Sequence, residues 1–267
     1  MSWLQWQLAR ESARSYEQVM VGAVLLPAAE ALVDRLKPGP GDAVLDAGCG
    51  TGTVSRLVVP LVGPMGRVAG VDVNPHMIDV AKQICPRAHL EIGDVRELAA
   101  AASAFDVVYA AHLVQFVAER SLAAHEIARV TRPGGRVAVS TWSSLERSPY
   151  FGAVHDALKT TLGSDVAGPL AVACSLGSAE ELARLLERAG LTRVVVEEVT
   201  MHLPLGELER FVPFHLASTP MAGVVRGAGD EAMAEMVGQV VARLDPAHTH
   251  DVVIAFRQLI ATATHPG

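Results

Sequence analysis

An acid and three glycines alternate with other residues along one short stretch, D-A-G-C-G-T-G, which runs from Asp46 to Gly52. Glycine adopts a positive φ readily and lets a backbone approach a bound molecule closely. The apolar residues before Asp46 predict a short buried strand, and Thr53 begins a helical pattern. Open α/β sheets bind ligands at the carboxyl ends of such strands. The spacing therefore predicts a ligand-binding loop between a strand and a helix.

The same stretch argues against two common phosphate-binding loops. Counted from Gly48, the dinucleotide fingerprint G-x-G-x-x-G requires a third glycine where this chain has Thr53. The P-loop also fails, because no Gly-Lys-Ser or Gly-Lys-Thr follows. Asp46 repels a pyrophosphate, whereas it suits a cationic or amine-bearing ligand. A glycine-rich turn of some other α/β protein is the alternative interpretation.

Two further acids end the next two expected strands. Asp72 closes a strand predicted over 67–72, and an acid there can accept both ribose hydroxyls of a nucleoside. The following helix is already served by Asn74 as its cap and Pro75 at its first position. Asp94 follows a strand predicted over 88–92. Three acids at three successive strand tips strengthen the prediction of a binding edge.

Strands and helices alternate along the rest of the chain, as a parallel sheet requires. The first 37 residues read as two helical stretches, broken near Met20 to Gly22 and ended by the K-P-G-P-G run at 37–41. We expect an irregular segment over 142–174 with one helix over 151–162. A capping box at Ser178 opens a helix over 179–189. Further strands are expected over 105–110, 136–141, 192–199 and 252–262; the alternative for the last is a helix over 256–261.

Composition limits the class of protein. The chain has 267 residues, 50% hydrophobic and 19% charged, which suits one large core with added segments. Its formal net charge is −7, and Lys and Arg are scattered, which disfavours a nucleic-acid substrate. Three cysteines without C-x-x-C spacing favour a reducing compartment, so we expect a cytoplasmic protein. No export signal or membrane-spanning run is evident.

Residues 42–142 resemble the core of class I S-adenosylmethionine (SAM) dependent methyltransferases. The motifs D-x-G-C-G-T-G, G-V-D-x-N, G-D, F-D-V-V, V-Q-F and R-P-G-G-R occur in the family's order and spacing. The nearest branch includes ubiquinone and menaquinone biosynthesis enzymes and many natural-product methyltransferases. The resemblance implies an α/β, Rossmann-like fold with a seven-stranded, mostly parallel sheet and helices on both faces. It also implies an N-terminal helical cap over 1–40, a SAM-binding core over 41–203, a helical lid over 204–250 and a closing strand over 251–267.

The resemblance further implies the cofactor and its contacts. SAM would be converted to S-adenosyl-L-homocysteine. Tyr16 would place an aromatic hydroxyl over the methionine end, Asp94 would meet the adenine amino group, and the backbone N–H of Val95 would meet the ring. The chain departs from the family at the loop 113–117 and at His112, where glutamine is usual. The predicted cofactor-binding residues are Tyr16, Asp46, Gly48, Gly50, Gly52, Asp72, Val73, Met77, Asp94, Val95, Ala111 and His112.

His112 is the candidate for chemistry beyond alignment of the reactants. Methyl transfer requires mainly proximity and exclusion of water, and a base is needed only when the nucleophile must lose a proton. His112 follows the fourth strand and is placed either as that base or as a polar contact of the cofactor's methionine part; both roles stay open. His155, His202 and His215 fall in segments on the expected substrate side, although a lone histidine is more often surface or satisfied core.

Other chemistries find little support. His248 and His250 beside Asp251 lack a third ligand at a plausible spacing, so we predict no metal. No G-x-S-x-G elbow is present for a serine hydrolase. A nicotinamide-dependent oxidoreductase is disfavoured by the glycine spacing.

The predicted function is therefore methylation of a small, largely apolar molecule, such as a secondary metabolite or a quinone-like compound. Apolar residues of the lid suggest a greasy pocket, or else they are core at helical spacing. The alternative function is a non-methylating SAM-binding protein recruited for a role such as substrate cyclisation. Neither nucleic acid nor membrane is expected as a partner, and the methylated atom and the oligomeric state stay open. The lid residues in question are Phe211, Phe214, Leu216, Met221 and Val224.

Overall fold

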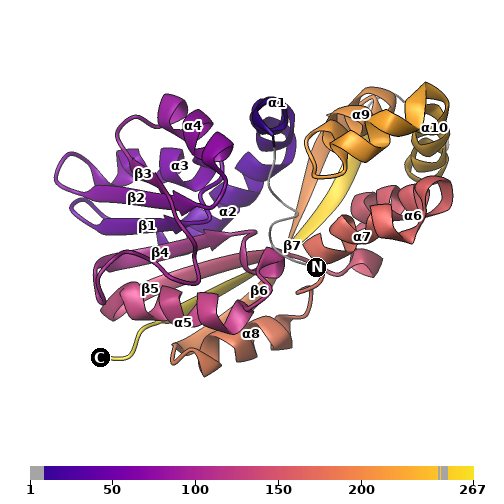
Figure 1. Ribbon diagram of the computed structural model, residues 1–267. Helices are drawn as coiled ribbons and strands as arrows, with labels where there is room; N and C mark the ends of the chain where they lie inside the picture. Colours follow the sequence, from indigo (N-terminus) through magenta and orange to yellow (C-terminus); the bar gives the residue numbers. More distant parts are fainter. Residues whose placement is uncertain (1–8, 246, 248–251) are drawn as a thin grey trace.

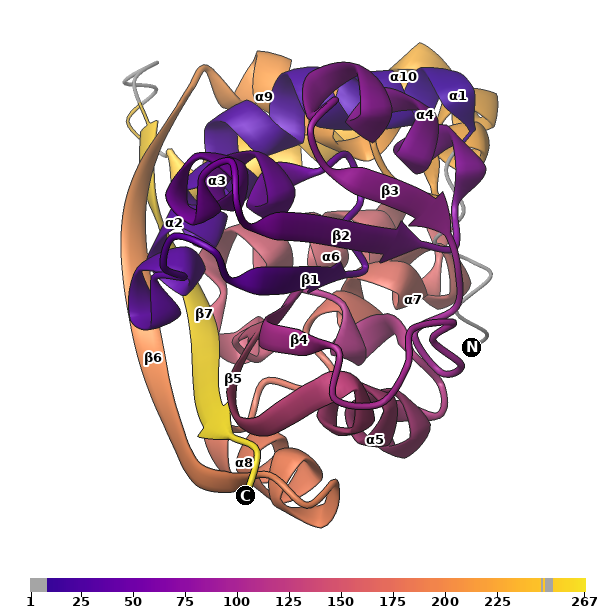
Figure 2. The ribbon, with the colours of Figure 1, turned by 90° about the vertical axis from the view of Figure 1, so that its left-hand side faces the viewer.

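A single seven-stranded sheet runs through the computed structural model, which describes residues 9–245, 247 and 252–267. The strand order is β3-β2-β1-β4-β5-β7-β6, and Figure 2 shows the strands side by side. The predicted Rossmann-like α/β fold is confirmed. The strands are β1 (Ala43–Ala47), β2 (Arg67–Asp72), β3 (His89–Ile92), β4 (Phe105–Ala111), β5 (Thr131–Trp142), β6 (Thr192–Gly206) and β7 (Val252–Thr264).

Only β7 runs against its neighbours among the described strands. It pairs antiparallel with β5, with Ser140 opposite Ile260, and with β6, with Val199 opposite Gln258. The pairs β1 with β2, β1 with β4, β2 with β3 and β4 with β5 are parallel. The strand expected over 252–262 is therefore confirmed, and the alternative helix is wrong. Parallel order brings the carboxyl ends of β1, β2, β3 and β4 to one edge.

Helices cover both faces of the sheet (Figure 1). One face packs on α2 (Leu26–Leu36) and α3 (Thr53–Val62), where Leu32 and Val58 meet Val107 in one apolar cluster. The α4 helix (Pro75–Ile84) lies on the same side, over β3 and the loop after β1. The opposite face packs on α5 (Arg120–Val130) and α8 (Ala179–Arg188).

A further group of helices continues beyond the sheet. It consists of α6 (Pro149–Leu162), α7 (Ser164–Ala173), α9 (Leu208–Ala217) and α10 (Ala222–Leu244), which we call the helical group. These helices share one apolar cluster with residues of β6 and β7. The prediction of an irregular segment with one helix over 142–174 is thus wrong in part, because α7 follows α6 as a second helix. Gly163, at φ 95°, turns the chain between the two helices without a steric penalty.

The N-terminal segment also differs from the prediction. A break was expected near Met20 to Gly22, but α1 (Arg10–Ser15) continues into a π-helix (Tyr16–Leu25) and then into α2. A glycine inside a helix costs only about 1 kcal/mol, and the buried side chains of Met20, Val21 and Val24 stabilise the continuous helix. Among the described residues, no helix combines the length and apolarity needed to span a membrane.

Candidate functional site

One cavity of about 220 Å³ opens at the carboxyl edge of the sheet. It extends from the loops that follow β1, β2, β3 and β4, past the π-helix, to the helical group. All of the predicted cofactor-binding residues line it except Gly52. Gly52 stands at the start of α3, where an added Cβ would meet Ala81 and Cys85 at the end of α4. The structure thus brings together residues spread over most of the first 112 positions. The predicted residues on the cavity are Tyr16, Asp46, Gly48, Gly50, Asp72, Val73, Met77, Asp94, Val95, Ala111 and His112.

The loop after β1 has the backbone that its glycines predict. Gly48, Gly50 and Gly52 have φ of 68°, 53° and 82°, in the left-handed region. A Cβ at Gly48 would stand 2.5 Å from Cδ1 of Leu113, so only glycine fits there without a shift. A Cβ at Gly50 meets nothing within 4 Å, which leaves its backbone open to a ligand.

Asp46 lies buried at the tip of β1. Its Oδ2 accepts hydrogen bonds from the backbone N–H of Ser55 at 2.9 Å and from Ser55 Oγ at 2.7 Å. Burial raises the pKa of Asp46 to about 6, against the lowering effect of Ser55, and nearby Asp72 raises it further.

Asp72 fastens the loops after β1 and β2 together. Its Oδ2 accepts from the N–H of Gly50 and its Oδ1 from the N–H of Asn74, each at 2.9 Å. Burial raises the pKa of Asp72 despite these two bonds. In the part of the chain that the structure describes, no Lys, Arg or His forms an ion pair with Asp46 or Asp72. Two neighbouring acids without a cation favour a positively charged ligand.

Asp94 has a different environment, because Arg96 holds its carboxylate. Nε of Arg96 lies 3.1 Å from both oxygens and Nη2 lies 2.7 Å from Oδ2, which lowers the pKa of Asp94. Arg96 also binds Glu119 at 2.5 Å and lines the cavity. Its type and position gave no signal in the sequence.

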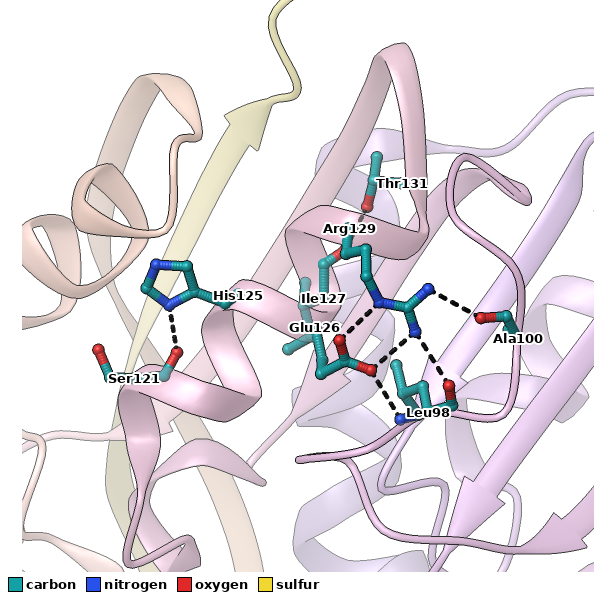
Figure 3. Close-up of polar contacts among 8 residues, drawn as sticks. All are labelled: Leu98, Ala100, Ser121, His125, Glu126, Ile127, Arg129 and Thr131. Atoms are coloured by element: carbon teal, nitrogen blue, oxygen red, sulfur yellow. Dashed lines mark hydrogen bonds and ion pairs between the residues drawn. The ribbon is translucent and has the colours of Figure 1, made fainter.

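The chain after Asp94 is fixed from α5 (Figure 3). Glu126 accepts the N–H of Leu98 at 2.8 Å, and Arg129 donates to the carbonyls of Leu98 at 2.9 Å and Ala100 at 3.0 Å. Arg129 and Glu126 also bind each other. This clamp orders the long connection between β3 and β4, and thereby the loop that carries Asp94 and Val95.

His112 follows β4 in a strained conformation, with φ at 48°. Its backbone N–H donates to the carbonyl of Ser140 at 2.9 Å, and its ring stacks on Trp142 with centroids 3.9 Å apart. Burial lowers the pKa of His112 to about 3. Gln258 lies close enough to offset part of that shift but not in hydrogen-bond geometry. Both ring nitrogens are covered and lack a hydrogen-bond partner among the described residues.

Tyr16 reaches the cavity from the π-helix. Burial raises the pKa of its hydroxyl, and the charges of Asp72 and Glu17 act in the same direction. The neighbouring Glu17 binds Arg56 through two contacts, of 2.8 and 2.9 Å. Arg56 in turn donates to the carbonyl of Thr51 at 3.3 Å. This chain of contacts tethers the N-terminal helix to the glycine loop.

Comparison with known proteins agrees with this geometry. Residues 45–139 match the family model described as a methyltransferase domain. This part of the chain is therefore a class I SAM-dependent methyltransferase domain.

Three similar proteins illustrate the range of this family. A malonyl-[acyl-carrier protein] O-methyltransferase of Serratia marcescens is 38% identical over 102 residues, which are 38% of this chain and 39% of that one. A demethylmenaquinone methyltransferase of Lactobacillus johnsonii is 28% identical over 62% of this chain and 75% of its own. A solved phosphoethanolamine N-methyltransferase of Haemonchus contortus, in complex with SAM, has a TM-score of 0.63 at 18% identity, covering 98% of this chain and 58% of its own. The chain spans two fifths or less of the length of several curated relatives.

The far end of the cavity was not predicted correctly. None of the five lid residues expected to form a greasy pocket lines it. Phe211, Leu216 and Met221 are buried in the apolar cluster of the helical group, whereas Phe214 and Val224 are 52% and 56% exposed. The core alternative therefore holds for the first three. The residues found instead are Phe116, Trp142, Phe151, Leu170, Ala173, His215, Ser218 and Thr219.

The other histidines considered in the sequence differ in whether they reach the cavity. His215 is buried on α9 and lines the cavity, while His202 is exposed and His155, paired with Asp156 at 3.2 Å, lies away from it. His248 and His250 with Asp251 lie outside the described residues. Within the described ranges, no group of three or more His, Cys, Asp or Glu could hold a metal ion.

The cavity offers groups that fit SAM. Thr51 lines it with a buried Oγ1 that has no hydrogen-bond partner among the described residues. Asp46 and Asp72 supply negative charge, and the open backbone at Gly50 leaves room for close contact. A ligand with a cationic centre and several hydrogen-bonding groups matches these features.

Proposed function

We propose that the protein transfers the methyl group of SAM to a small, largely apolar molecule. The observation that carries this proposal is that a single cavity joins the acidic strand tips to an uncharged end lined by Trp142, Phe151 and Leu170. A charged cofactor and an apolar acceptor can then meet inside one enclosure.

On the cofactor side, the chain's own groups would bind SAM and orient its ribose, its adenine and its cationic centre. The second lone pairs of the Asp72 oxygens are available to the ribose hydroxyls, because each oxygen accepts one backbone N–H and no other bond from the residues that the structure describes. Asp94 and the N–H of Val95 form the adenine side, and Arg96 fixes the carboxylate. Asp46 and Asp72 contribute negative charge near the cationic centre. Bound SAM supplies an electrophilic methyl group on a sulfonium.

On the acceptor side, the chain supplies alignment and a dry environment. The apolar lining at the acceptor end disfavours water beside the reacting groups, which limits competing hydrolysis and strengthens the electrostatic interactions there. Transfer then depends mainly on holding the nucleophilic atom in line with the methyl group. His112 stays a proposed contact of the cofactor or base, although its ring nitrogens are covered as the ring stands.

The acceptor class is inferred from charge and kinship. The net charge of −7 and scattered basic residues argue against nucleic acid. Relatives that are named as methyltransferases of demethylmenaquinone and of nocamycin support a quinone-like or natural-product acceptor.

Calorimetric titration of SAM and S-adenosylhomocysteine tests the cofactor half. We expect micromolar binding of both. Turnover is then measured as S-adenosylhomocysteine formed in the presence of a panel of hydroxynaphthoquinones, phenols and hydroxylated polyketides. If neither SAM nor S-adenosylhomocysteine binds, the proposal is contradicted. SAM binding together with chemical conversion of an acceptor, but without S-adenosylhomocysteine formation, would instead support the non-methylating alternative.

A further inference from the structure

No described residue at the end of the cavity nearest the helical group carries a charge. In the described ranges, four charged residues line the cavity: Asp46, Asp72, Asp94 and Arg96. All four stand at the tips of strands or just after them. The opposite end is formed by β5, α6, α7 and α9, and its lining residues are Trp142, Phe151, Leu170, Ala173, His215, Ser218 and Thr219.

His215 is a neutral imidazole at this end. It is 3% exposed, and burial lowers its pKa to about 4, so it carries no charge at neutral pH. Its Nδ1 lies 3.0 Å from the hydroxyl of Tyr150 on α6. Phe211 stacks on the imidazole and meets the Tyr150 ring edge-on, with centroids 6.4 and 5.5 Å away. These contacts fix the orientation of the His215 ring.

The hydroxyl of Tyr150 decides which nitrogen of His215 carries the proton. Tyr150 is 1% exposed, and burial raises its pKa, so it keeps its proton. Among the described residues, Nδ1 of His215 is the acceptor within reach of that hydroxyl. If Nδ1 were protonated instead, the buried O–H of Tyr150 would have no acceptor, which is unfavourable. The tautomer that satisfies both groups has Tyr150 donating to Nδ1 and leaves the proton on Nε2.

The two hydroxyls at this end already donate their protons within the protein. The hydroxyl of Ser218 donates to the carbonyl of Phe214 at 2.8 Å, and that of Thr219 donates to the carbonyl of Leu216 at 2.7 Å. The ring nitrogens of His112 are covered. Among the described residues, Nε2–H of His215 is therefore left as a donor for a ligand at this end, together with the indole N–H of Trp142, whose ring stacks on His112.

We propose that His215 binds the methyl acceptor by donating a hydrogen bond from Nε2 to one of its oxygens, with Tyr150 as the positioning residue. The acceptor is then an uncharged, largely apolar molecule with a carbonyl, phenolic or enolic oxygen. This proposal rests on the proposed function only in calling the ligand a methyl acceptor. The hydrogen-bond donor and its geometry are properties of the protein without cofactor. His215 acts as a donor and not as the base.

Nitrogen-15 NMR of the histidine rings tests the tautomer without any ligand. We expect the His215 ring at pH 7 to be neutral with its proton on Nε2, and the signal is assigned with His215→Gln. In Tyr150→Phe, which keeps the ring, the preference for that tautomer is expected to fall. Tyr109→Phe is the matched control, because Tyr109 is an equally buried tyrosine whose hydroxyl contacts the carbonyl of Val33. A proton on Nδ1 in the wild-type protein, or an imidazolium, would overturn the proposal.

Fragment binding tests the acceptor class, with acetophenone as a neutral carbonyl probe and benzoate and benzylamine as charged probes. We expect acetophenone to shift the Nε2–H signal and to bind about three- to tenfold more weakly to His215→Phe, the range for losing one hydrogen bond. Benzoate and benzylamine are expected to bind at least tenfold more weakly than acetophenone. Tighter binding of either charged probe, or equal binding of acetophenone to His215→Phe, overturns the proposal. Each titration is run with and without S-adenosylhomocysteine, so a missing cofactor site is recognised separately.

Discussion

Asp72→Asn tests whether the second strand tip holds the cofactor ribose or only the loop. Both carboxylate oxygens of Asp72 accept one backbone N–H, from Gly50 and Asn74. A hydrogen bond to a charged group contributes about 1.5–3 kcal/mol. Asparagine keeps one acceptor oxygen and turns the other into a donor, so one of two ribose bonds is lost and the other becomes neutral. We expect about 2–3 kcal/mol less binding energy, which is roughly 30- to 150-fold in Kd.

The assay is calorimetric titration of both SAM and S-adenosylhomocysteine, with thermal unfolding of each variant alongside. The two ligands share the ribose, so both should weaken, and SAM should weaken somewhat more because its sulfonium also loses the attraction of the Asp72 charge. Asp79→Asn is the matched control, because Asp79 lies on α4 with a side chain 48% exposed and pairs with Arg10. We expect that control to bind as the wild type does.

Two results would refute this reasoning. Unchanged affinity in Asp72→Asn would mean that the carboxylate serves the loop alone. A loss for SAM but not for S-adenosylhomocysteine would mean that Asp72 acts on the sulfonium charge and not on the ribose.

Three further outcomes are expected. Gly48→Ala forces an alanine into a left-handed conformation and toward Leu113, and should lower the free energy of unfolding in urea by about 1–2 kcal/mol. Adding Leu113→Ala should restore only the part of that loss that comes from the contact with Leu113, and an unchanged unfolding free energy in Gly48→Ala would contradict the clash. Glu17→Gln removes a charge from the pair with Arg56 and should weaken SAM binding severalfold in calorimetry while changing stability by about 1 kcal/mol or less; equal affinity would show that the tether does not serve the site. The pKa of His112 is lowered to about 3 in the folded protein, so the unfolded chain binds more protons between pH 6.5 and 3, and stability falls as pH falls through that window. His112→Gln should therefore flatten the dependence of the unfolding free energy on pH by up to about 1.4 kcal/mol per pH unit. Identical slopes for the variant and the wild type in urea unfolding at pH 7, 5.5 and 4 would argue against a buried neutral ring.

The cofactor side could be predicted because its signals are local. A strand, a turn and a helix are consecutive in sequence here. The pattern of Asp46 and the glycines after it therefore predicts both the local structure and its position at the carboxyl end of a strand. Parallel alternation then brings Asp72 and Asp94 to the same edge without further information. Arg96 escaped notice because nothing in the spacing distinguishes it from a surface arginine, although it binds the acid two residues before it.

The far end could not be predicted in the same way, because its residues come from four elements between positions 142 and 219. One signal was nevertheless present on α9. Leu208, Phe211, Val212 and His215 recur at helical spacing and are buried, whereas Phe214 falls outside that stripe and is 52% exposed. Hydrophobicity alone pointed to Phe214, but helical period points to its neighbour His215.

The two ends of the cavity select their ligands by opposite means. At the strand tips, Asp46 and Asp72 lack a cation among the described residues, so a positive ligand lowers the cost of burying them. At the far end, a charged acceptor would lose its hydration without gaining an ion pair, which costs several kcal/mol per ion. An uncharged acceptor loses little and gains apolar contact. Selectivity at this end therefore depends on the exclusion of ions, and a hydrogen bond from His215 needs only to orient what the apolar walls have already admitted.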